Sequence, residues 1–161
     1  MSKNHVNTYD MSGEYGVGYT SKGVQFFFDK EDYELIKHYK WYLNSNGYIY
    51  CSHPRKIAFH RLVMGVSDRK CIIDHIHHNK LDNRKAELRI VTATQNQMNQ
   101  IPRKHSSSCT GVSWHKKSKK WIAQISVNGK LKCLGMYKGE DEAIKARKNA
   151  EQIYYGAYAF R

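Results

Sequence analysis

The sequence predicts an α+β protein in two parts, the second of which is a three-stranded antiparallel sheet packed on one helix. Three observations lead to this expectation. Short strand-like runs and polar turns fill residues 1–100, and a segment of linker composition, IPRKHSSS, follows at 101–108. Three alternating runs and one helical run come after it. We therefore expect a first region over residues 1–100, a linker over 101–107 and a second domain over 108–161.

The first region opens with alternating strand and turn signals. The run VQFFF at residues 24–28 is rich in strand-forming side chains, and residues 29–39 predict a short helix capped by their first residue, an aspartate. Aromatic runs at 41–43 and 48–51 flank an Asn-Gly step, which favours a hairpin. One more strand is expected at 56–59.

The pattern changes after residue 70. Residues 71–76 and 88–91 predict two short strands joined by a long polar loop. A helix is then expected to begin after Thr92, because Thr92 and Gln95 match the S/T-x-x-E/Q capping box. The predicted order is therefore strand, long loop, strand and helix.

The second domain gives the clearest local signals. Strands are expected at 111–116, 121–127 and 131–137, and the Asn-Gly step at 128–129 predicts a hairpin turn between the last two. Residues 139–155 predict a helix with acidic side chains in its first turn. Its expected apolar stripe consists of Ala143, Ala146, Ala150, Ile153 and Tyr154.

The charge balance narrows the class of partner. The chain holds 27 Lys and Arg against 14 Asp and Glu, and residues 101–161 account for 13 of the basic and only 4 of the acidic side chains. Such an excess favours a polyanion, with nucleic acid first and an anionic membrane surface second. No apolar run approaches the roughly 20 residues that span a bilayer, and the first 20 residues lack the apolar core of a signal peptide. We expect a cytoplasmic protein without a membrane partner.

The cysteines argue against a structural metal. Cys51, Cys71, Cys109 and Cys133 are scattered, and no two form a C-x-x-C pair. A zinc ribbon is therefore not expected, and neither is any other structural zinc. Disulfides are not expected in a reducing compartment, so we interpret these side chains as small hydrophobes.

The densest chemistry lies in residues 74–99. Asp74 and His75 are adjacent at a strand end, where a carboxylate can bind a metal and an imidazole can act as a base. The amide of Asn96 on the following helix could complete the protein ligands, and hard oxygen donors suit Mg²⁺ or Mn²⁺. Neighbouring strand residues point to opposite faces, however, so Asp74 and His75 could instead be one exposed and one buried.

At these residues the chain resembles the HNH endonucleases, particularly the small phage and intron-encoded homing type. The resemblance covers about residues 60–99 and rests on these matches: His60-Arg61-Leu62, Asp74-His75-Ile76, Asn79, Leu81, Asn83-Arg84, Leu88-Arg89 and Val91-Thr92. It implies a ββα-metal fold over about 60–100, with His75 as the general base and with Asp74 and Asn96 as metal ligands. It also implies supporting roles for His60, Asn79, Asn83, Arg84 and Asn99.

One position departs from the family pattern. Glu87 stands before Leu88-Arg89, where the family has an asparagine that holds the loop and orients the catalytic histidine. Because this family position supports the catalytic histidine, we expect Glu87 to be a catalytic residue together with His75. An ionised glutamate accepts hydrogen bonds but donates none, and its charge is expected to raise the pKa of the base. The departure puts full activity in doubt.

From residue 108 onward the chain resembles the APETALA-type (ethylene-response-factor-like) DNA-binding domain. The matches are Gly111-Val112, Trp114, Lys120-Trp121, Ala123, Ile125, Leu134-Gly135, Tyr137, Glu142-Ala143 and Ala146. The family lays its sheet in the major groove of DNA. The expected DNA-binding residues are Ser113, His115, Lys116, Lys117, Lys119, Lys120, Gln124 and Ser126, with Gln124 at a base edge and the lysines at phosphates. Ser113, His115 and Ser126 replace arginines of the plant domains, which argues for weaker or different base readout. A solvated lysine turn on a generic module is the alternative.

Together these patterns predict a metal-dependent endonuclease that nicks double-stranded DNA, of the site-specific homing type. One active site per chain favours a monomer that cuts one strand, whereas a concerted double-strand cut would need a dimer. A catalytically impaired relative that only binds specific DNA sequences is the main alternative. An RNA-binding protein is a weaker one, because no aromatic RNA-recognition motif is present.

Overall fold

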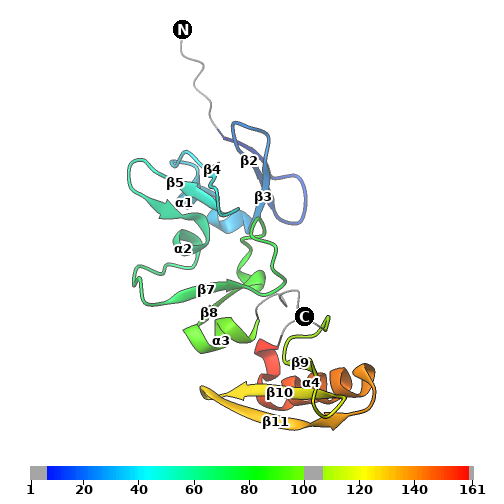
Figure 1. The fold of residues 1–161 in the computed structure, drawn as a ribbon. Helices are drawn as coiled ribbons and strands as arrows, with labels where there is room; N and C mark the ends of the chain where they lie inside the picture. Colours follow the sequence, from blue (N-terminus) through cyan, green and yellow to red (C-terminus); the bar gives the residue numbers. More distant parts are fainter. Residues whose placement is uncertain (1–6, 100–106, 160–161) are drawn as a thin grey trace. The chain divides into compact units, whose positions relative to one another are not determined.

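The computed structural model describes residues 7–99 and 107–159. The chain forms two compact units, Met1–Val91 and Thr92–Arg161 (Figure 1). The expected linker at 101–107 lies outside the described residues except for Ser107. Among the helices of the described ranges, none has the length and apolar character that a membrane span requires.

The first unit contains two small antiparallel sheets. One has the order β1-β2-β3, with strands Thr8–Asp10, Gly16–Tyr19 and Gln25–Phe28. The other has the order β4-β5-β6, with strands Tyr42–Leu43, Ile49–Cys51 and Ile57–Ala58. The expected Asn-Gly turn joins β4 to β5, because the Gly47 N–H donates to the Asn44 carbonyl oxygen.

Two expectations for this unit were wrong in detail. Residues 29–39 form only a 3₁₀ turn, η1 (Lys30–Asp32), and a one-turn helix, α1 (Tyr33–Ile36). Asp29 makes no side-chain cap there, because its carboxylate instead accepts the N–H of Lys85, 2.8 Å away. The expected strand at 56–59 ends at Ala58, and Phe59 begins helix α2 (Phe59–Val63).

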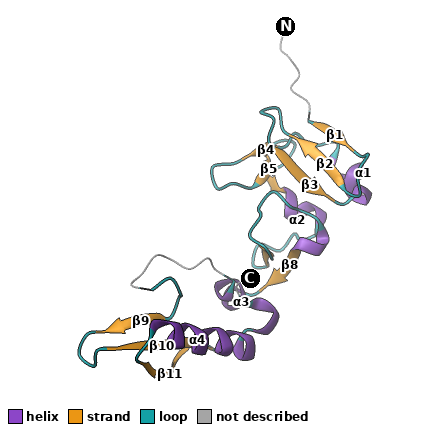
Figure 2. Cartoon of the chain, turned by 90° about the vertical axis from the view of Figure 1, so that its right-hand side faces the viewer, coloured by secondary structure: helices purple, strands orange, loops and turns teal. Residues whose placement is uncertain are grey.

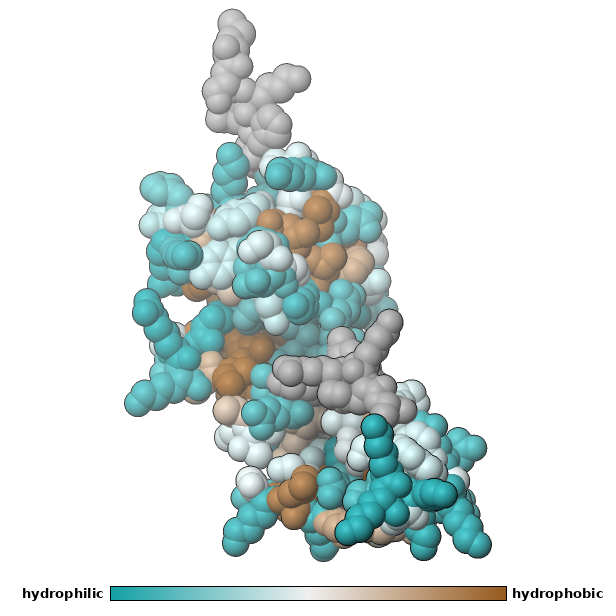
Figure 3. Space-filling model, viewed as in Figure 1, coloured by the Kyte–Doolittle hydropathy of each residue, from teal (hydrophilic) through white to brown (hydrophobic). Residues whose placement is uncertain are grey.

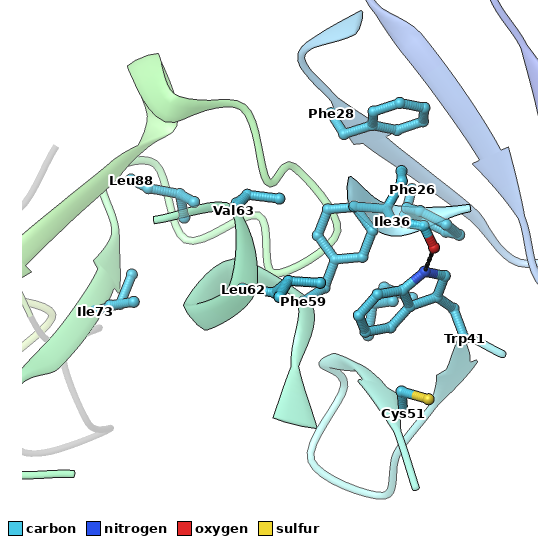
Figure 4. Close-up of a cluster of buried hydrophobic side chains, with 11 residues drawn as sticks. Phe26, Phe28, Ile36, Trp41, Cys51, Phe59, Leu62, Val63, Ile73 and Leu88 are labelled. Carbon is cyan, nitrogen blue, oxygen red and sulfur yellow. Dashed lines mark hydrogen bonds between the residues drawn. The ribbon is translucent and has the colours of Figure 1, made fainter. Parts of the chain in front are cut away.

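The core of the first unit is aromatic. Phe59 of α2 points toward Phe26 of β3 and toward Trp41, with ring centroids 5.1 and 4.7 Å away (Figure 4). Trp41 is buried, and its indole N–H donates to the Ile36 carbonyl oxygen. Gly18 of β2 lies under the Phe26 ring, where an added Cβ would stand 2.2 Å from a ring carbon. This packing fixes α2, and with it His60, against the sheets.

The β7–β8 hairpin carries the polar stretch. β7 (Ile72–His75) pairs antiparallel with β8 (Leu88–Val91). The connecting loop contains a 3₁₀ turn, η2 (Lys85–Glu87), and docks on β3. Phe27 of β3 donates its N–H to the Leu81 carbonyl and accepts the N–H of Asn83, each at 2.8 Å. The long loop is thus held by backbone hydrogen bonds.

The second unit contains the predicted sheet and helix. Strands β9 (Val112–His115), β10 (Lys120–Val127) and β11 (Lys130–Tyr137) form an antiparallel sheet with β10 central. Helix α4 (Glu140–Tyr154) lies along one face (Figure 2), and the short turn η3 (Gly156–Tyr158) follows it. Helix α3 (Ala93–Met98) begins at the predicted capping box of Thr92 and Gln95. The prediction of an α+β chain with small antiparallel sheets is therefore confirmed.

The apolar stripe expected on α4 is only partly correct. Ala143 and Ala150 are buried, but Ile153 is 76% exposed. Arg147 is buried instead, where its guanidinium donates to the Gln124 carbonyl oxygen and to Glu151. A charged side chain can occupy that position because both hydrogen-bond partners lie within reach.

Candidate active site

Asp74 and His75 are both buried at the end of β7. Their side chains are 9% and 5% exposed, so the alternative in which one of them is exposed does not hold. In the β7–β8 ladder Asp74 stands opposite Arg89 and His75 opposite Leu88. The Asp74 Oδ2 accepts hydrogen bonds from Arg89 Nε at 2.9 Å and Arg89 Nη2 at 2.7 Å. The guanidinium therefore compensates the buried carboxylate.

His75 lies in an aromatic cluster. Its ring centroid is 5.4 Å from that of His60 on α2 and 5.8 Å from that of Tyr48 before β5. Burial lowers the pKa of His75, and Lys80 acts in the same direction, whereas Asn83, Asp74 and Asp82 act to raise it. Burial dominates, so the imidazole is neutral at pH 7 and able to accept a proton.

His60 carries the second buried imidazole of the cluster. Burial, followed by the effects of His75 and Arg61, lowers the His60 pKa to about 4. The His60 Nδ1 is buried and makes no hydrogen bond with the described residues. His60 is thus held neutral beside His75 by packing.

Asn83 is the most deeply buried polar residue of the loop. Its side chain is fully enclosed, and its Nδ2 donates to the Leu81 carbonyl oxygen at 3.1 Å. Asn83 also acts to raise the pKa of His75, although the Asn83 Oδ1 makes no hydrogen bond of ordinary geometry. Asn79 shapes the same loop, because its Oδ1 accepts the Leu81 N–H at 3.2 Å. Arg84 pairs with Asp82 and lies 4.5 Å from the centroid of the Tyr15 ring.

The carboxylate of Glu87 interacts with His77 rather than with His75. The His77 Nδ1 and Glu87 Oε2 are 2.6 Å apart. The groups with the largest effects on the His75 pKa do not include Glu87, and the expected effect of its charge on the base stays a prediction. The Glu87 backbone contributes separately, because its carbonyl oxygen accepts the Ile76 N–H at 2.9 Å.

Asn96 of α3 and Asn99, which caps the C-terminal end of that helix, belong to the second unit. The Asn96 backbone N–H donates to the Thr92 carbonyl oxygen at 2.9 Å, and the Asn99 side chain is buried. The metal-binding role of Asn96 stays a prediction. In the parts of the chain that the structure describes, no cluster of three or more His, Cys, Asp or Glu side chains could hold a metal ion.

The expected DNA-binding residues lie on the β9–β10–β11 sheet and its first turn. Ser113 and Ser126 are exposed on the face away from α4, and Gln124 is half-buried. His115 Nδ1 lies 2.7 Å from Ser118 Oγ in that turn. The four lysines of the turn are exposed: Lys116, Lys117, Lys119 and Lys120. The registers Ile122↔Met136 and Ser126↔Leu131 put exposed apolar side chains on the same face, which the sequence analysis missed.

Apolar surface is not confined to that sheet. Figure 3 shows small apolar patches on a largely hydrophilic surface. Isolated apolar side chains of this kind are normal on soluble domains. They therefore identify no site without further observations.

Sequence reasoning also missed two residues near His75. Tyr48 and Lys80 belong to no sequence motif, because what links them is a contact that forms only in the folded chain. The Lys80 ammonium lies 4.6 Å from the centroid of the Tyr48 ring. Asn46, two residues before Tyr48, accepts a hydrogen bond from Lys80 at 2.9 Å through its backbone carbonyl. Only the fold brings the β4–β5 turn to the β7–β8 loop.

A buried carboxylate and a neutral imidazole at the end of a β-hairpin define a candidate hydrolytic site. A comparison with known proteins shows the family to which the chain belongs. The chain is 31% identical over 141 residues to an uncharacterized HNH endonuclease of Acanthamoeba polyphaga mimivirus, a match that covers 83% of this chain and 68% of the relative. The chain therefore belongs to the HNH endonuclease family. No family model and no solved structure matches it.

Proposed function

We propose that the chain is a divalent-metal-dependent endonuclease that hydrolyses phosphodiester bonds in double-stranded DNA, with His75 as the general base. One observation carries this proposal: His75 is buried and neutral beside the buried carboxylate of Asp74. The name of the mimivirus relative supports a nuclease at the level of the family. Site-specific nicking of the homing type is part of the proposal, and it rests on the sequence resemblance alone.

The donor set fits a hydrated hard cation better than zinc. Asp74 offers a carboxylate, which is a ligand that Mg²⁺ and Mn²⁺ accept while keeping several waters. The family resemblance adds the amide oxygen of Asn96 as a predicted ligand. Cysteine thiolates, which would favour zinc, are not part of the set. Mg²⁺ or Mn²⁺, when bound, supplies positive charge against the phosphate that is attacked. Arg89 keeps the Asp74 carboxylate oriented through two hydrogen bonds, and that carboxylate would also hold the cation.

The protein's own groups perform the proton transfer. At pH 7 the neutral His75 imidazole accepts a proton from the attacking water. Asn83 and Asp74 both favour the imidazolium that results, because each acts to raise the His75 pKa. The surrounding rings of Tyr48 and His60 exclude bulk water from one side of the base. This environment keeps the base available until the substrate is bound.

The second unit would hold the DNA. Residues 101–161 carry most of the net positive charge of the chain, because their 13 basic and 4 acidic side chains give +9 of the total of +13. The exposed lysine turn suits the phosphate backbone, and the sheet face with Gln124 suits base edges. This division of labour follows the APETALA-type resemblance and is proposed on that basis.

A second candidate function is sequence-specific DNA binding without cleavage. The observation that favours it is the ion pair between Asp74 and Arg89, because a guanidinium on the carboxylate competes with a cation. Glu87, in place of the family asparagine, points the same way. The two candidates differ in one measurable property, which is cleavage.

The first prediction is that the chain nicks supercoiled plasmid with Mg²⁺ or Mn²⁺ and stops when a chelator is added. His75→Ala should lower the nicking rate by about 10²- to 10⁴-fold, the usual cost of losing a general base. It should leave plasmid affinity unchanged, since the imidazole is buried. His38→Ala is the matched control, because His38 is exposed on another segment. Equal rates for the two variants would contradict the assignment, and a wild type that binds but never nicks would favour the second candidate.

A further inference from the structure

The β7–β8 loop and strand carry four cationic side chains, and three of them are already neutralised. Arg84 pairs with Asp82, Lys85 pairs with Glu31 and Asp32, and Arg89 pairs with Asp74. Lys80 is the exception. It is exposed, and within the described ranges of the chain it forms no salt bridge. Its positive charge is therefore available to an anionic ligand.

The position of the Lys80 ammonium is fixed by two contacts. It donates a hydrogen bond to the Asn46 carbonyl oxygen at 2.9 Å and lies 4.6 Å from the centroid of the Tyr48 ring. Neither contact is with an anion, and an ammonium group has three donors, so the group keeps donors for a ligand. The β4–β5 turn thus holds the cation in place before any substrate binds.

The same Tyr48 ring connects Lys80 to the proposed base. The centroid of the Tyr48 ring is 5.8 Å from that of the His75 ring, so ammonium, phenol ring and imidazole lie in succession. Lys80 also belongs to the charges that influence His75. A phosphodiester attacked by water next to His75 would therefore meet Lys80 as well.

We propose that Lys80 is a catalytic residue that binds a non-bridging oxygen of the scissile phosphate and stabilises the negative charge that builds up there during hydrolysis. This inference rests on the proposed function. A compact ammonium suits a phosphate as a point charge. A cation held in advance stabilises the transition state without reorganisation at the moment of reaction. No covalent step involves Lys80; its contribution is electrostatic.

The test compares variants that lose the same charge at two places. Lys80→Met keeps the aliphatic stem against Tyr48 but removes the ammonium. Lys22→Met is the control, because Lys22 is exposed in the β2–β3 turn, at the end of that hairpin away from the Phe27 contact with the loop. We measure single-turnover nicking of supercoiled plasmid at saturating protein with Mg²⁺ or Mn²⁺. Lys80→Met should be slower by about 10- to 100-fold, somewhat less than the loss of a buried donor. Lys22→Met should remain close to the wild type.

A second measurement separates a phosphate contact from a merely structural role. In a His75→Ala background that does not cut, binding to a 30-base-pair duplex is measured against salt concentration. Lys80→Met should reduce the log–log slope by about one unit, with an unchanged melting temperature. A nicking rate for Lys80→Met equal to that of Lys22→Met would overturn this inference and leave the proposed function standing. A wild type that never nicks would overturn both.

Discussion

At the scale of single residues, burial determines the chemistry of this site more than residue type alone does. Burial lowers the pKa of His60 and of His75, which are two of the histidines that the structure describes. The family pattern predicts the positions of Asp74 and His75. It does not predict Arg89 on Asp74, or the rings of Tyr48 and His60 on His75, because those contacts depend on how the sheets fold back on α2.

The burial of His60 predicts an acid-labile fold. The unfolded chain binds a proton at His60 near the ordinary pKa of 6.5, whereas the folded chain does so only near 4. Stability from this residue is therefore complete above about 6.5 and is lost as the pH falls toward 4, with a maximum loss of about 3 kcal/mol. His60→Phe keeps a ring but cannot bind a proton. In urea unfolding at pH 7.5 and 4.5, the variant should lose less stability than the wild type. Equal losses would show that His60 is not responsible.

At the scale of elements, the path of the β7–β8 loop determines which side chains lie near the histidine. Glu87 occupies the position of the family asparagine, yet its carboxylate binds His77, and the buried Asn83 acts on His75 instead. The Asn83 N–H donates to the Phe27 carbonyl oxygen of β3, and this backbone hydrogen bond fixes Asn83 at that point. Sequence spacing alone could not reveal this arrangement, since it depends on the path of the loop.

Because of this arrangement, Glu87→Asn should change the nicking rate only a few-fold. The pair of His77 and Glu87 is partly exposed, so its loss should cost about 1 kcal/mol of stability or less. Asn83→Ala should be far more damaging, because it empties a fully enclosed position beside the base. Nicking rates and urea unfolding of both variants check this. A Glu87→Asn variant as inactive as His75→Ala would mean that Glu87 is itself catalytic.

At the scale of the whole molecule, the sequence predicts the second unit better than the first. Alternation and an Asn-Gly turn are local signals, and they predict β10, β11 and their hairpin closely. The buried Arg147 was missed because its partners, Gln124 and Glu151, are brought to it only by the packing of α4 on the sheet. The second compact unit begins at Thr92, whereas linker composition predicts a second domain that begins at residue 108, and those domain bounds stay a prediction.

The start of the second unit at Thr92 leads to a prediction about the stability of fragments of the chain. Met98 of α3 packs against the buried cluster of Ile125, Ala150, Tyr155 and Ala159, so α3 covers the core of the sheet and α4. A fragment of residues 92–161 should therefore be more stable than one of residues 101–161, by about 1–2 kcal/mol for one partly buried Met. Residues 92–100 contain no charged side chain, so both fragments carry the same 13 basic and 4 acidic residues. Their DNA binding should then show the same salt dependence despite different melting temperatures. Met98→Ala in the longer fragment should remove most of the difference. Equal melting temperatures for the two fragments would instead assign α3 to the nuclease region, as the sequence boundary had it.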